Sequence, residues 1–70
     1  MGEYTWIVIG EASRLPVATF HRRYELVSWL RSRNGVSTLR GFRLRGNISG
    51  GFEVVELDLE WVRDDRFLGK

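Results

Sequence analysis

The sequence predicts a small α+β domain, with an antiparallel sheet of three or four strands and one helix packed on one face of that sheet. Three observations predict it: runs of β-forming residues toward both ends, one amphipathic helical stretch in the middle, and glycine- and asparagine-containing turns between them. A chain of 70 residues supports one hydrophobic core. We therefore expect a single domain over residues 1–70, with residues 64–70 as a loosely ordered tail.

The first predicted element is a strand over residues 4–9. Its sequence, Tyr-Thr-Trp-Ile-Val-Ile, is a continuous run of β-forming residues with apolar side chains on both alternating faces, and Gly10 ends it. This pattern is typical of a central strand that is buried on both sides.

Residues 15–20 fit two predictions. As a second strand the segment would form a hairpin with the first, and Pro16 would have to lie near the strand start or on an edge. As the beginning of the helix it would use Ser13 as the cap and place Pro16 in the first turn, where a missing N–H costs nothing. The element order is β-β-α-β-β in the first case, which we favour, and β-α-β-β in the second.

Residues 21–33 form the clearest predicted helix. At about 100° per residue, five apolar side chains fall on one arc: Phe20, Tyr24, Leu26, Val27 and Leu30. Asn34 and Gly35 follow, and both residue types accept the left-handed conformation that ends helices. Arginines in the last turn suit the negative end of the helix dipole.

The last third of the chain predicts a hairpin with its turn at residues 47–51. Phe42 and Leu44 alternate with Arg43 and Arg45 on the outgoing strand, residues 37–46. On the return strand, apolar residues alternate with acidic ones: Val55, Leu57, Leu59 and Trp61 with Glu56, Asp58 and Glu60. We expect one apolar and one charged face, on which the two arginines either pair with the acidic residues across the hairpin or contact a partner.

One helix of 13 residues cannot cover both faces of such a sheet. The first strand nevertheless carries Tyr4, Trp6 and Val8 on one face and Thr5, Ile7 and Ile9 on the other. Exposed apolar patches on small proteins usually mark interfaces. We expect a partner protein or a second copy, in a homodimer, to cover the second face.

The charge distribution supplies candidate contact residues. The net charge is +2, yet residues 12–46 hold eight arginines and one acidic residue, and both flanking segments are acidic. Arginine suits bidentate contacts to phosphate or carboxylate, and Trp and Arg are enriched at the centres of protein interfaces. The predicted partner-binding residues are Arg22, Trp29, Arg31 and Arg33 on the helix and Arg43 and Arg45 on the strand.

Catalytic, cofactor and metal sites are not expected. The chain has no cysteine and one histidine, His21, so the usual zinc ligand sets cannot be assembled, and no nucleophile stands in a recognisable motif. The acidic residues of the return strand and Asp64-Asp65 are interpreted as solvated. A domain of this size also leaves little room for a pocket of several hundred cubic ångströms, so no small-molecule substrate is expected.

These observations predict a non-catalytic protein-binding module, comparable to small phage-type inhibitors or modulators that occupy the surface of a host protein or nucleoprotein machine. The alternative is a nucleic-acid-binding module that uses the arginine-rich helix and strand. No apolar run approaches the roughly 20 residues that cross a bilayer, and the first residues lack the pattern of a secretory leader. We expect a cytoplasmic protein that does not bind membranes.

Overall fold

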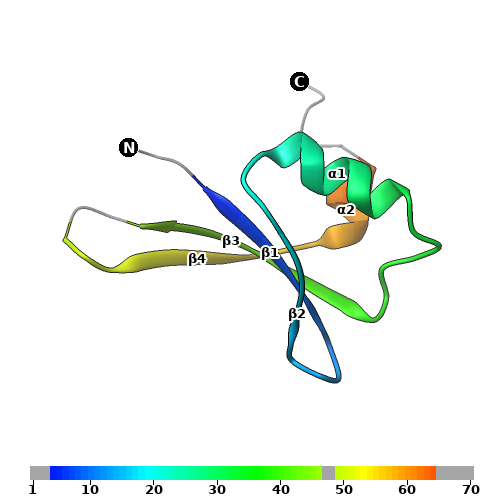
Figure 1. Ribbon diagram of the computed structural model, residues 1–70, viewed down its shortest axis with the longest axis horizontal. Coiled ribbons are helices and arrows are strands. Elements are labelled where there is room, and N and C mark those ends of the chain that lie inside the picture. The colour runs from blue at the N-terminus through cyan, green and yellow to red at the C-terminus, as the bar shows by residue number, and fades with distance from the viewer. Residues whose placement is uncertain (1–3, 47–48, 65–70) are drawn as a thin grey trace.

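The computed structural model describes residues 4–46 and 49–64, and shows a sheet with two helices beside it (Figure 1). The elements in chain order are β1 (Thr5–Gly10), β2 (Pro16–Phe20), α1 (Arg23–Arg31), β3 (Leu39–Gly46), β4 (Phe52–Leu57) and α2 (Leu59–Arg63). The strand order is β2-β1-β3-β4, and each neighbouring pair is antiparallel. The predicted α+β class is confirmed. The predicted tail lies outside the described residues, except for Asp64.

The first hairpin decides between the two predictions for residues 15–20. Phe20 pairs with Trp6 and Ala18 pairs with Val8, so the segment is a strand. Pro16 is the first residue of this edge strand, where its missing N–H removes no ladder hydrogen bond. The turn before it is closed by Arg14, whose N–H donates to the Gly10 carbonyl at 2.9 Å. The β-β-α-β-β order is therefore correct up to the end of β4.

Helix α1 is shorter than predicted and buries a slightly different face. It begins at Arg23, after the extended residue Arg22, and ends at the C-cap Ser32. Leu26, Val27 and Leu30 are buried as predicted. Tyr24 is 67% exposed, so its assignment to the apolar face was wrong. The reason is angular: Tyr24 lies about 160° around the helix from Leu26, on the far side of the buried arc.

The return strand ends earlier than predicted, because a second helix begins. Strand β4 stops at Leu57, and the Asp58 carboxylate caps α2 by accepting a hydrogen bond from the Trp61 N–H at 3.3 Å. Aspartate is a favoured N-cap, and an acidic first turn and a basic last turn both suit the helix dipole. The strand prediction was therefore wrong over Leu59 and Trp61, and the acidic stripe of Glu56, Asp58 and Glu60 does not exist.

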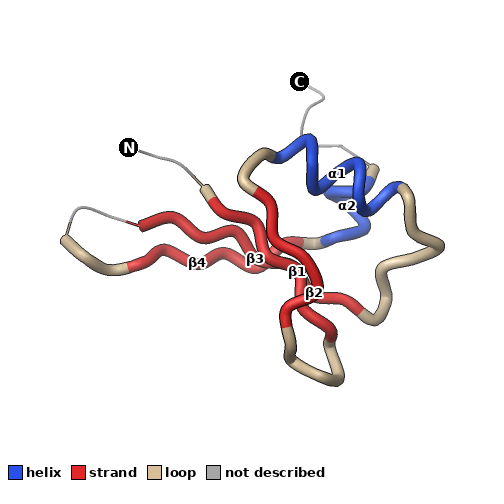
Figure 2. The backbone as a smooth tube through the Cα atoms, in the orientation of Figure 1, coloured by secondary structure: helices blue, strands red, loops and turns tan. Residues whose placement is uncertain are grey.

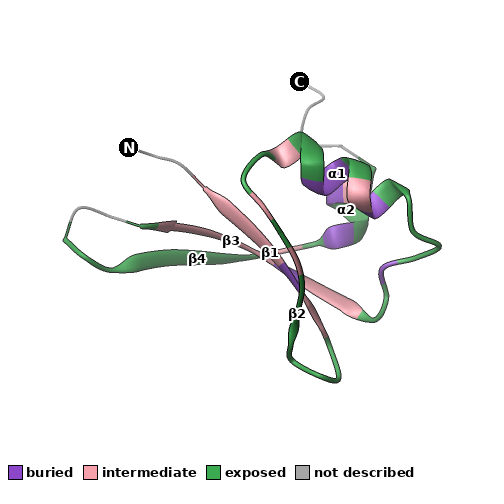
Figure 3. Cartoon of the chain, viewed as in Figure 1, coloured by how far each residue is buried: buried purple, intermediate pink, exposed green. Residues whose placement is uncertain are grey.

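Both helices lie on the same side of the sheet (Figure 2). We call this side the helix face; it carries Trp6 and Val8 of β1, Gly41 of β3 and Leu57 of β4. The small core lies between this face and the helices, where Figure 3 shows the buried segments. Its buried residues among those described are Val8, Leu26, Val27, Leu30, Val36, Leu59 and Val62.

Gly41 allows α2 to pack directly on the sheet. A Cβ built at this position would overlap the Leu59 Cδ2 and would lie 3.1 Å from the Leu59 Cγ. Because Gly41 has no side chain, Leu59 reaches the backbone of β3 next to Val8. The missing side chain therefore fixes how closely the helix approaches the strand.

We predict that Gly41→Ala destabilises the protein by about 1–3 kcal/mol, because the methyl group overpacks a buried contact. The change is read from the free energy of unfolding in urea. Gly35→Ala is the control, since a Cβ there meets nothing within 4 Å. It should leave stability unchanged or raise it slightly. Equal effects of the two substitutions would contradict the close approach of Leu59 to β3.

Candidate interaction surfaces

The second side of the sheet carries a patch of apolar side chains, which we call the open face. Residues paired across antiparallel strands point to the same side, so the register assigns its members. Thr5, Leu44 and Val54 form one row across three strands, and Ile7, Phe42 and Glu56 form the next. Ile9 and Phe52 extend the patch along β1 and β4. The alternation of β1 thus predicted this face correctly.

The open face is not covered by any element within residues 4–46 and 49–64. Val54 is 57% exposed and Phe52 is 73% exposed, while Ile7, Ile9, Phe42 and Leu44 are half-buried by their neighbours in the sheet.

An ion pair lies at the border of the open face. The Arg40 guanidinium donates two hydrogen bonds of 2.9 Å to the Glu56 carboxylate, and it lies 5.6 Å from the centre of the Phe42 ring. The hydrogen bond from Arg40 lowers the pKa of Glu56 below its ordinary value, and the same contact raises the pKa of Arg40. The two charges on this side therefore neutralise each other.

The pairing predicted for Arg43 and Arg45 differs from the observed one. Arg45 forms an ion pair of 3.0 Å with Glu53, whereas Arg43 lies between Trp6 and Val55 in neighbouring strands. The reason is the register: Gly46 pairs with Phe52 across residues 47–51, which aligns odd-numbered residues with odd-numbered ones. Glu56 therefore faces the opposite side of the sheet from Arg43.

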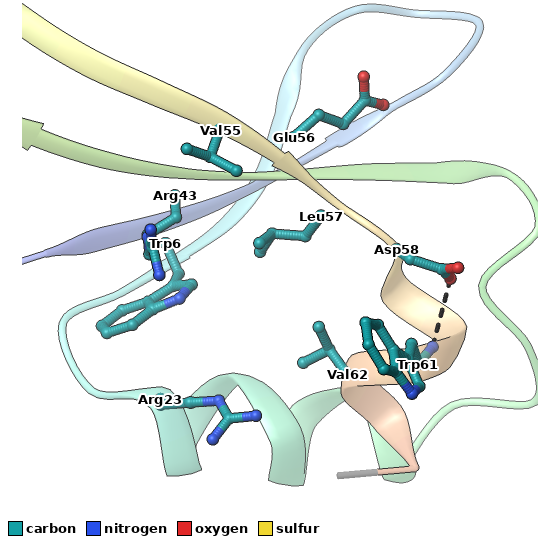
Figure 4. Close-up of a pocket in the computed structure, with 9 residues that line it drawn as sticks. All are labelled: Trp6, Arg23, Arg43, Val55, Glu56, Leu57, Asp58, Trp61 and Val62. Atoms are coloured by element: carbon teal, nitrogen blue, oxygen red, sulfur yellow. Dashed lines mark hydrogen bonds between the residues drawn. The ribbon is translucent and has the colours of Figure 1, made fainter. Parts of the chain in front are cut away.

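A groove opens on the helix face between β4, β3, β1 and the two helices (Figure 4). Its volume is about 510 Å³, so the fold leaves more room for a pocket than the sequence predicted. It is lined by Trp6, Arg23, Arg43, Val55, Glu56, Leu57, Asp58, Trp61 and Val62. The groove exists because α2 turns away from the end of β4 and leaves a gap above Val55 and Leu57.

The predicted contact residues of the helix lie at its two ends. Arg22 is exposed and precedes the first turn of α1. Trp29 is half-buried, with its ring 5.7 Å from the Phe20 ring and the Arg33 guanidinium 4.6 Å from its own ring centre. The Arg31 Nε donates to the Arg63 carbonyl at 2.9 Å. That any of these residues contacts a partner stays a prediction.

The structure places the predicted arginines of the helix and of the strand on different surfaces. Arg31 and Arg33 share a hollow of about 500 Å³ with Arg63 and Asp64 at the C-terminal end of both helices. Arg43 and Arg45 lie elsewhere, on the helix face of β3, where both guanidiniums contact the Tyr4 ring, at 4.4 and 5.5 Å. The predicted arginines therefore form separate groups and not one basic surface.

The described part of the chain shows no group of three or more histidine or acidic residues that could hold a metal ion. Among the same residues, no helix has the length and apolarity to span a bilayer. Comparison with protein-family models, with curated proteins and with solved structures finds no match to this chain.

The ion pair at the border of the open face gives a pH prediction. The lowered pKa of Glu56 means that its contribution to stability is present above the ordinary value of about 4.5 and is lost as the pH falls through the lowered pKa. We expect NMR titration of the Glu56 carboxyl to show the lowered pKa, and Arg40→Gln to return it toward the ordinary value. Arg45→Gln, the control, should leave it unchanged.

Proposed function

We propose that this chain is a non-catalytic protein-binding module whose contact surface is the open face. The supporting observation is a patch of six apolar side chains across β1, β3 and β4 that no described element covers: Ile7, Ile9, Phe42, Leu44, Phe52 and Val54. Large exposed apolar patches on small soluble domains usually mark protein interfaces. A module that acts by occupying a surface can inhibit or modulate its target without catalytic groups.

The size of the patch indicates the strength of binding. Three strands spaced about 4.8 Å apart, with a rise of about 3.4 Å per residue, give a flat area of roughly 350 Å². Stable complexes bury about 800 Å² on each partner. Two copies that met only through this patch would therefore associate weakly. A partner that binds with higher affinity must also contact residues around the patch.

The charges beside the patch permit a second copy to bind. Arg40 and Glu56 already neutralise each other, so two open faces can approach without repulsion between unpaired charges. A symmetric dimer requires such a self-complementary surface. We therefore include a weak homodimer in the proposal.

Light scattering over a concentration series tests the proposed surface. We predict that the weight-average mass rises above that of the monomer from about 10 µM to about 1 mM, in the range of weak association. Val54→Lys should hold the protein monomeric, because it places a charge within the patch, beside Leu44. Tyr24→Lys, which places the same charge at another exposed position, on α1, should not.

A monomeric mass at every concentration would contradict the homodimer. The proposal that the open face binds another protein would remain, and the Val54→Lys variant tests it as well. A partner that binds the wild-type protein and the Val54→Lys variant with equal affinity would show that the open face is not the contact surface.

Nucleic-acid binding is the second candidate function, and the hollow lined by Arg31, Arg33 and Arg63 is the observation that favours it. Clustered arginines attract phosphate groups. Asp64 lies in the same hollow, and the other predicted arginines lie on different surfaces. The continuous basic surface that tracks a nucleic-acid backbone is therefore not formed by the described residues, and we place this function second.

A salt titration separates the two candidates. We expect labelled single- and double-stranded DNA to bind at low salt at most, and binding to be lost near 0.15 M, where surface charges are screened beyond about 8 Å. Binding that persists at that salt, and that weakens in an Arg31→Gln, Arg33→Gln double variant, would place nucleic-acid binding first. Fluorescence polarisation of the labelled DNA measures the affinity at each salt concentration, for the wild-type protein and for the variant.

A further inference from the structure

The groove on the helix face has a chemistry that the open face lacks. Val55, Leu57 and Val62 form an apolar floor, and the indole rings of Trp6 and Trp61 lie at its two ends (Figure 4). The two arginines of the lining, Arg43 from β3 and Arg23 from α1, both lie toward the Trp6 end. The groove thus combines a hydrophobic middle with positive charge at one end.

Arg43 supplies a guanidinium that the surrounding sheet does not neutralise. Its cross-strand neighbours are Trp6 on β1 and Val55 on β4, and both are apolar. Its guanidinium lies 4.4 Å from the centre of the Tyr4 ring, which orients it without removing its charge. The ion pairs of β3 within the described residues join Arg40 to Glu56 and Arg45 to Glu53, and none joins Arg43 to a carboxylate.

The two acidic residues of the lining are engaged elsewhere. Glu56 points away from the groove, and both of its carboxylate oxygens accept hydrogen bonds from Arg40 on the open face. The Asp58 carboxylate accepts the hydrogen bond that caps α2. The backbone hydrogen bond leaves Asp58 its charge, but this carboxylate lies toward the Trp61 end, away from Arg43 (Figure 4). Neither acidic side chain pairs with Arg43, so the Trp6 end of the groove favours an anion.

We propose that this groove is a binding site for a small amphipathic anion, a flat aromatic body that bears one carboxylate. The body would lie between the two indole rings over the apolar floor, and the carboxylate would accept hydrogen bonds from the Arg43 guanidinium. The volume of about 510 Å³ lies within the range of small-molecule sites, roughly 300–1,000 Å³. This inference does not depend on the proposed function of the open face.

Naphthalene-2-carboxylate is a suitable probe, and the three tryptophans report where it binds. In a ¹H–¹⁵N correlation spectrum each indole N–H gives its own signal. Trp6 and Trp61 line the groove, whereas Trp29 lies against Phe20 and Arg33 outside it. We expect saturable shifts of the Trp6 and Trp61 signals during the titration, while the Trp29 signal stays in place.

The role of the charge is tested with a neutral ligand and a matched variant. The alcohol 2-naphthalenemethanol should bind at least about tenfold more weakly than the carboxylate, because a hydrogen bond between charged groups is lost. Arg43→Gln should weaken binding of the carboxylate by a similar factor. Arg45→Gln removes the same charge from the same side of the same strand, outside the lining, and should leave the affinity unchanged.

Three results would overturn the proposal. The first is the absence of saturable shifts at millimolar probe. The second is equal binding of the acid and the alcohol to the wild-type protein, a comparison that does not depend on any variant folding. The third is loss of binding in Val54→Lys, which would place the probe on the open face. Retained binding in Val54→Lys supports the groove whatever the outcome for the protein-binding proposal.

Discussion

The structure depends on the one-sided packing of its helices. Helices α1 and α2 hold 9 and 5 residues, and both pack on the face that carries Val8. Val8 is fully buried, whereas Ile7 and Ile9, its neighbours along β1, are only half-buried on the other side. A chain of this length has too little helix to cover two faces. The open face is therefore a direct consequence of how the short helices are placed.

The position of α2 on the sheet determines the groove on the helix face. Leu59 contacts the backbone of β3 at Gly41, and Asp58 caps the helix that begins there. These two contacts hold α2 over β3 directly after the end of β4, and the space left over Val55 and Leu57 is the groove. Of the two acidic residues of the lining, Glu56 is paired with Arg40 and Asp58 lies at the Trp61 end, which leaves Arg43 to set the charge at the Trp6 end.

Much of the fold could be predicted from the sequence, because its signals are local. The continuous apolar run of β1 and the helical spacing of Leu26 and Leu30 are read from neighbouring residues, and the uncovered face followed from the alternation of β1. Helix α2 was missed because Leu59 and Trp61 also fit a strand alternation, although Leu59 and Val62 have helical spacing. The register, and with it the partners of Arg43, depends on the exact pairing across residues 47–51. The groove is assembled from four elements and has no local signal.

The central claim is that one sheet face is covered and the other is open. The most direct test measures the broadening of methyl NMR signals by a soluble gadolinium chelate in dilute protein. The structure predicts strong broadening for Ile7, Ile9, Leu44 and Val54, and little for the buried methyl groups of Val8, Leu26 and Leu30. Equal protection of Ile7 and Val8 in the dilute monomer would contradict the claim, because the open face would then be covered by the chain itself.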